Sequence, residues 1–286
     1  MTEMIIEALE RRAGEAVQRV SIPRAFLRSV GLRLADVPPD GYVARVWSGE
    51  EWMEQTLVGF YATGMLPGGE GAPGLTASAS RYWHEEVELG AAVWDSRELK
   101  AMLLASGFRG LVFALVTVEG DVVDVTPYAP GGALFAALEG VQGPLAAWHQ
   151  APTPLLESWT VGLVVSRFPW PWPADSAVSV PSLEPRVARH FWSAEGDLRS
   201  DALFSGSLLG WATAWSQRLG DAVGRAARTA RSLEVPGLQW RVGAHRDLLE
   251  CFGAFLNAHT LPRPADTPDP EDSSPSSPSL HPPTCS

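Results

Sequence analysis

Alternation of apolar and polar positions is clearest between Gly107 and Tyr128, where two segments rich in β-branched residues flank Glu119-Gly120-Asp121. This spacing is typical of a β-hairpin. Successive side chains of a strand point to opposite faces. One face of the first strand would therefore carry Leu111, Phe113 and Leu115, and the other Val112, Ala114, Val116 and Val118. Because both faces are apolar, we expect a strand that is covered on both sides.

A similar alternation predicts a strand over Trp159–Phe168. One face would carry Trp159, Val161, Leu163 and Val165, and the other Thr160, Gly162, Val164 and Ser166. The prolines of residues 169–173 cannot join a ladder of hydrogen bonds, so the strand should end there. Shorter strands are expected over Tyr42–Trp47 and Ala91–Trp94.

Apolar residues three and four positions apart predict helices elsewhere in the chain. The ranges are 2–20, 49–65, 97–105, 130–141, 144–148, 201–233 and 245–259. The longest stripe, in 201–233, begins after the possible caps Ser200 and Asp201 and ends at Pro236-Gly237. Residues 66–80 hold four glycines and two prolines, which favours a surface loop.

These elements predict an α+β fold with a mainly antiparallel sheet of four to five strands. We expect an α+β domain at 1–170, a proline-rich strap at 171–185, and a helical part at 186–261 that packs on the first domain. A single compact domain that includes both parts is the alternative. From residue 262 onward the chain is dominated by Pro, Ser, Thr and Asp, so a disordered tail is expected at 262–286.

Composition narrows the class of protein. The 286 residues are 45% hydrophobic, include only two cysteines and carry a formal net charge of −11. The cysteine count favours a reducing compartment, and no apolar run is long enough for a signal peptide or a membrane span. We therefore expect a cytoplasmic protein without a membrane partner. The acidic balance makes nucleic acid an unlikely ligand, because phosphate contacts dominate that affinity.

Positive charge gathers in one segment. Residues 198–246 hold seven arginines against Asp201, Asp221 and Glu234. On the predicted long helix, four of them lie largely opposite the apolar stripe: Arg218, Arg225, Arg228 and Arg231. Because a guanidinium forms forked hydrogen bonds, this face could bind an acidic protein partner or a phosphate-bearing ligand. The alternatives are a solvated helix face or one that lies against the acidic half of the same chain.

A candidate metal site lies in Trp83-His84-Glu85-Glu86-Val87-Glu88. On a helix, His84 and Glu88 would face the same way, with Glu85 placed as a general base. Glu88 stands where a zinc protease has its second histidine, and a strand would instead align His84, Glu86 and Glu88. A solvated acidic surface is the simpler interpretation. Asp121 and Asp124, near the hairpin tip, are a second possible acidic pair for a divalent cation.

No nucleophile elbow, phosphate-binding glycine loop or Cys-x-x-Cys pair occurs in the chain. We therefore predict a non-enzymatic protein-binding or regulatory module of the inhibitor or immunity type, with no cofactor. Two alternatives remain open. One is a metal-dependent hydrolase or nuclease, and the other is a small anionic-ligand-binding protein with its pocket beneath Arg225 and Arg228.

Overall fold

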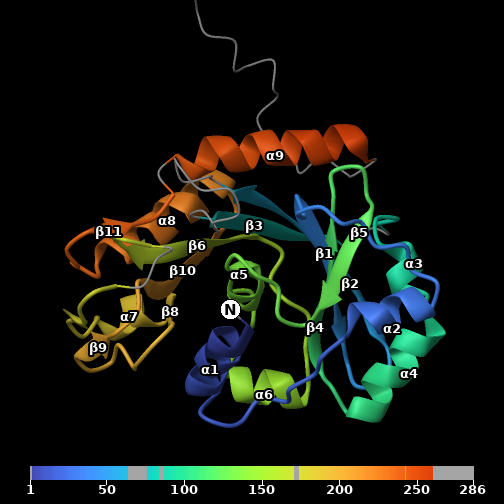
Figure 1. Ribbon diagram of the computed structural model, residues 1–286, viewed down its shortest axis with the longest axis horizontal. Coiled ribbons are helices and arrows are strands. Elements are labelled where there is room, and N and C mark those ends of the chain that lie inside the picture. Colours follow the sequence, from blue (N-terminus) through green and yellow to red (C-terminus); the bar gives the residue numbers. More distant parts are fainter. Residues whose placement is uncertain (1, 64–75, 84–86, 171–173, 242, 260–286) are drawn as a thin grey trace, which may run out of the picture.

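The structure of the protein, a computed structural model, describes residues 2–63, 76–83, 87–170, 174–241 and 243–259. Its centre is a wide antiparallel sheet with the strand order β5-β4-β1-β2-β3-β6-β10-β8, and β11 pairs with β6 beside this path (Figure 1). The strands are β1 (Gly41–Trp47), β2 (Trp52–Thr63), β3 (Thr76–Trp83), β4 (Gly110–Val116), β5 (Val122–Thr126), β6 (Trp159–Arg167), β8 (Phe191–Ser193), β10 (Leu208–Ser216) and β11 (Leu238–Gln239). A separate pair joins β7 (Val178–Val180) to β9 (Ala202–Phe204).

Helices cover both faces of the sheet (Figure 1). One face packs against α2 (Arg24–Ser29), α3 (Ala91–Trp94), α4 (Arg97–Ser106), α8 (Leu219–Arg231) and α9 (Ala244–Ala258). The other face packs against α1 (Thr2–Ala13), α5 (Ala133–Leu138) and α6 (Leu145–Gln150). The short helix α7 (Pro185–Ala188) leads into β8. Two hydrophobic cores result, one on each side of the sheet.

The predicted α+β class and antiparallel sheet are confirmed, although the sheet has nine strands and not four to five. The hairpin is β4 and β5, and β4 is buried along its whole length. Its two predicted faces lie in different cores: Leu111, Phe113 and Leu115 in one, and Val112, Ala114 and Val116 in the other. The predictions for β1, β6, α4 and α9 are also confirmed in element type.

Three element predictions are wrong. Residues 52–63 form β2 and not a helix, and Ala91–Trp94 is the helix α3 and not a strand. The predicted helix over 201–233 is helical only from Leu219, since Ala202–Phe204 and Leu208–Ser216 are strands. For β10 the reason is burial on both faces, since Trp211 lies in one core and Ala212 in the other. Its continuous apolar run therefore satisfies a helical period as well as a strand period.

Several predictions concern residues outside the described ranges. The glycine-rich loop predicted at 66–80 lies outside them up to residue 75, and Thr76–Ser80 belongs to β3. The predicted tail at 262–286 also lies outside them. The division into parts at 1–170 and 186–261 stays a prediction, and strands of both parts share the one sheet through the pairing of β6 with β10. Among the helices of the described residues, none is long and apolar enough to cross a bilayer.

Candidate anion-binding site

Arginines gather near the sheet edge formed by β8. At this edge α1 and α7 contact β8, and α8 packs on the neighbouring strand β10 (Figure 1). Three neighbouring cavities open there, and Arg189 lines all of them. We call them the α8 cavity, the middle cavity and the α1 cavity, and together the arginine groove. The groove is lined by seven arginines: Arg11, Arg12, Arg186, Arg189, Arg199, Arg225 and Arg228. Its only acidic lining residues within the described ranges are Glu139 and Asp197.

The α8 cavity has a volume of about 650 Å³. It is lined by Arg186, Val187, Arg189, His190, Thr213, Ala214, Trp215, Arg225, Arg228, Thr229 and Ser232. Four of these residues are arginines, and none of the described lining residues is acidic. A concave site of this size that concentrates one sign of charge attracts ligands of the opposite sign.

Local structure explains how these arginines come to the same cavity. Arg225 and Arg228 are three residues apart on α8, so they are neighbours on its exposed side while Ala222 and Ala226 pack into the core. Arg225 Nη1 donates a hydrogen bond to the carbonyl oxygen of Trp215 at 3.0 Å. The helix α7 and the residue that follows it contribute Arg186 and Arg189 to the same cavity.

Between the α8 cavity and the middle cavity lies a hydrogen-bonded network centred on Glu139, whose side chain is only 7% exposed. Its carboxylate lies 3.0 Å from His190 Nδ1 and also accepts a hydrogen bond from the Thr213 hydroxyl. On the other side of the imidazole, Arg189 Nε donates to Nε2 at 2.9 Å. Because Nε2 accepts a hydrogen bond, Nδ1 is the atom that donates to Glu139, and the network ties the residue before β8 to β10 and to the end of α5.

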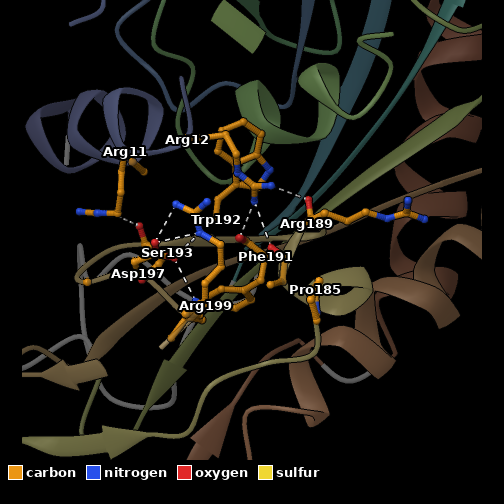
Figure 2. A pocket seen from close by; sticks show the side chains of 13 residues that line it. Arg11, Arg12, Pro185, Arg189, Phe191, Trp192, Ser193, Asp197 and Arg199 are labelled. Atoms are coloured by element: carbon orange, nitrogen blue, oxygen red, sulfur yellow. Dashed lines mark hydrogen bonds and ion pairs between the residues drawn. The ribbon is translucent and has the colours of Figure 1, made fainter. Parts of the chain in front are cut away.

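The α1 cavity, of about 190 Å³, is built around two arginines at the end of α1 (Figure 2). Arg12 donates to three backbone carbonyl oxygens, those of Ala188 (3.2 Å), Arg189 (3.0 Å) and Phe191 (2.7 Å). Its guanidinium also lies 4.5 Å from the ring centre of Trp192, within the range of a cation–π contact. Arg11 Nη1 donates to the carbonyl oxygen of Ser193 at 2.8 Å.

The charges of the α1 cavity are incompletely paired. Hydrogen bonds from Arg199, at 2.9 and 3.2 Å from its Nε, lower the pKa of the Asp197 carboxyl group. Burial lowers the pKa of Arg12, and the Glu139 carboxylate opposes this shift without cancelling it. Burial removes water from the charged guanidinium, so a bound anion would stabilise its charged form.

The structure separates the four arginines that the sequence grouped together. Arg225 and Arg228 line the α8 cavity, as the predicted pocket beneath them requires. Arg218 is the exposed residue that precedes α8, and Arg231 lies 5.7 Å from the Trp240 ring. Neither lines the arginine groove. Sequence reasoning missed the other five arginines, and the Arg11-Arg12 pair at the end of a helix was the only local signal for them.

The predicted metal site at His84, Glu85 and Glu88 stays a prediction. His84 and Glu85 lie outside the described residues, and Glu88 is exposed. Across the described ranges, no group of three or more His, Cys, Asp or Glu side chains could hold a metal ion. Near the hairpin tip, the Asp124 carboxylate accepts a hydrogen bond from the backbone N–H of Val125 at 2.9 Å, an ordinary structural contact.

In comparisons with known proteins, this chain resembles solved structures alone. No family model and no curated protein matches the chain. Similar structures include phosphoribosylamine–glycine ligase from Thermotoga maritima (15% identity, 72% of this chain and 55% of that chain, TM-score 0.46). A biotin carboxylase–β,γ-ATP complex from Campylobacter jejuni has 11% identity, with coverage of 77% and 52% and a TM-score of 0.43. N5-carboxyaminoimidazole ribonucleotide synthetase from Thermotoga maritima has 12% identity, with coverage of 82% and 73% and a TM-score of 0.33.

These comparisons correct the predicted function. The similar structures are a ligase, two carboxylases and a synthetase, which contradicts the prediction of a non-enzymatic protein-binding or regulatory module. The chain spans about half the length of the first two structures. No ligand or residue role passes from them to this chain, because both sequence identity and TM-score are low.

Proposed function

We propose that this protein binds a small phosphate-bearing molecule in the α8 cavity. The observation that carries the proposal is the set of four arginines that line one cavity without an acidic residue among its described lining residues. Arg186 also pairs with Glu184, which is not a lining residue, at 2.7 Å. Like charges gathered in this way repel one another, and a bound phosphate relieves that repulsion. Each guanidinium can form two parallel hydrogen bonds to phosphate oxygens, which also fixes the orientation of the group.

The rest of the cavity suits the remainder of a small molecule. Trp215 lines its wall and is 37% exposed, which is high for so large an apolar side chain. An apolar surface beside a few convergent polar groups is the usual composition of a small-molecule site. The protein carries a net charge of −11, so the positive groove also distinguishes this surface from the rest of the molecule.

Isothermal titration with inorganic pyrophosphate at low ionic strength tests the proposal. A hydrogen bond to a charged group contributes about 1.5–3 kcal/mol, so Arg225→Gln and Arg228→Gln should each weaken binding by roughly 10- to 150-fold. The matched controls are Arg218→Gln and Arg231→Gln, which remove the same charge from the same helix outside the cavity. They should change the affinity by less than about threefold, by screened long-range attraction alone.

Two results would reject the proposal. One is the absence of measurable pyrophosphate binding by the unmodified protein. The other is an equal loss of affinity in all four variants, which would show that general attraction by α8 and not the cavity is responsible.

A further inference from the structure

The α8 cavity and the α1 cavity are joined by shared lining residues. Arg12, Arg189 and Trp192 line both the α1 cavity and the middle cavity. Arg189, His190 and Trp215 line both the middle cavity and the α8 cavity. One surface therefore runs from Arg225 and Arg228 to Arg11 and Arg12. The binding of one phosphate at its α8 end accounts for only part of the positive charge along it.

At the α1 end, the arginine side chains are held in fixed positions, unlike mobile arginines on an open surface. The guanidinium groups of Arg11 and Arg12 are held in place by backbone carbonyl oxygens of residues 188–194. A guanidinium has five N–H donors. These bonds engage some of the donors and fix the position of the rest, which reduces the entropy lost when an anion binds. Figure 2 shows Arg11, Arg12 and Arg199 among the side chains that line this cavity.

The charges that line the α1 cavity also favour an anionic ligand. Asp197 is the single acidic residue among the described lining residues of the α1 cavity, against Arg11, Arg12, Arg189 and Arg199. Its carboxylate is occupied by Arg199, with an N–O distance of 2.8 Å. The other arginines are left without a lining carboxylate of their own, in a cavity too small for more than a compact group.

We infer that the ligand of the arginine groove carries two anionic groups, one bound in the α8 cavity and the other, a phosphate or a carboxylate, in the α1 cavity. This inference rests on the proposed function, because it places the first group where that function places the phosphate. Arg189 lies between the two groups, and Trp192 and Trp215 contact the part of the ligand that connects them.

A series of alkane-α,ω-bisphosphonates of increasing length tests the inference, with the alkyl monophosphonate of equal length as the reference at each step. When both ends bind, the second contact is intramolecular, and affinity exceeds that of a single contact by about 10²- to 10⁴-fold. Titration calorimetry should therefore show an affinity maximum at one chain length, at least 100-fold above the matching monophosphonate. Shorter chains cannot reach both cavities, and longer chains lose effective concentration.

Substitutions in each cavity identify where each end of the bisphosphonate binds. Arg11→Gln should reduce the affinity of the best bisphosphonate to that of its monophosphonate and leave the monophosphonate affinity unchanged. Arg228→Gln should weaken both compounds. Should Arg11→Gln fail to fold, Arg11→Lys keeps the charge and removes the forked geometry, and a loss of at least tenfold for the bisphosphonate alone is expected. The control is Arg28→Gln, an exposed arginine on α2 outside the groove.

The possible failures are distinguishable. Equal affinities of bisphosphonate and monophosphonate at every length would overturn the second anion site while leaving the α8 cavity as a phosphate site. A maximum that survives Arg11→Gln would place the second group elsewhere and also overturn the inference. Absence of binding by any phosphonate would reject both this inference and the proposed function.

Discussion

The two edges of the sheet are built on different principles. At one edge, β5 and β4 form a hairpin from adjacent residues, and most of the side chains that β4 buries are apolar. We call this the hairpin edge. At the other edge, β8 is only three residues long, and the nearby cavities are lined by arginines from distant parts of the chain. The hairpin edge stabilises the fold, whereas the arginine groove concentrates like charges that a fold alone does not need.

The largest expected effect on stability concerns the hairpin edge. Phe113 is fully buried and packs edge-on against Tyr42, with 5.4 Å between the ring centres. Phe113→Ala should lower the free energy of unfolding by about 3–5 kcal/mol, measured by urea denaturation, because it leaves a cavity in the core. The folded variant should still bind pyrophosphate.

Leu104→Ala is the matched control, since this apolar side chain on α4 is 57% exposed. Its free energy of unfolding should change by less than about 0.5 kcal/mol. If both substitutions had the same effect, burial would not be the reason why the hairpin edge stabilises the protein.

An intermediate effect is expected from Arg12, the one cation of the groove that the fold itself uses extensively. Arg12→Gln removes hydrogen bonds to three backbone carbonyl oxygens and the contact with the Trp192 ring. We expect a loss of about 2–3 kcal/mol in the free energy of unfolding, measured by thermal and urea denaturation. An unchanged stability would show that the groove does not depend on this arginine for its shape. Arg28→Gln again supplies the control.

The smallest expected effect is on the acid sensitivity of the hairpin edge. Burial lowers the pKa of His149, which lies on α6 close to the start of β4 at Gly110. The unfolded state then binds the proton more readily, so His149 destabilises the fold as the pH falls below its unfolded pKa of about 6.5. His149→Gln should therefore show a smaller drop in Tm between pH 7.5 and pH 5 than the unmodified protein. Equal drops in both proteins would contradict this origin.

Much of the hairpin edge could be predicted from the sequence because its contacts are local. The alternation in Leu111–Val116 determines which side chain enters which core, and a short turn brings β5 beside β4. The cap of α4 is a local contact as well, since the backbone N–H of Leu99 donates to the Ser96 hydroxyl at 3.2 Å. In these segments the neighbours in sequence are also the neighbours in space.

The arginine groove is different because tertiary structure alone brings its parts together. The sequence indicated the positive charge of α8, but not that Arg225 and Arg228 would face Arg186 and Arg189 while Arg218 and Arg231 would not. Nor could it place Arg11 and Arg12 beside residues 188–194, almost 180 positions away. The local pattern of apolar residues determines which side of an element is buried. Which charged sides then meet across a cavity depends on strand order, and here the order β6-β10-β8 decided it.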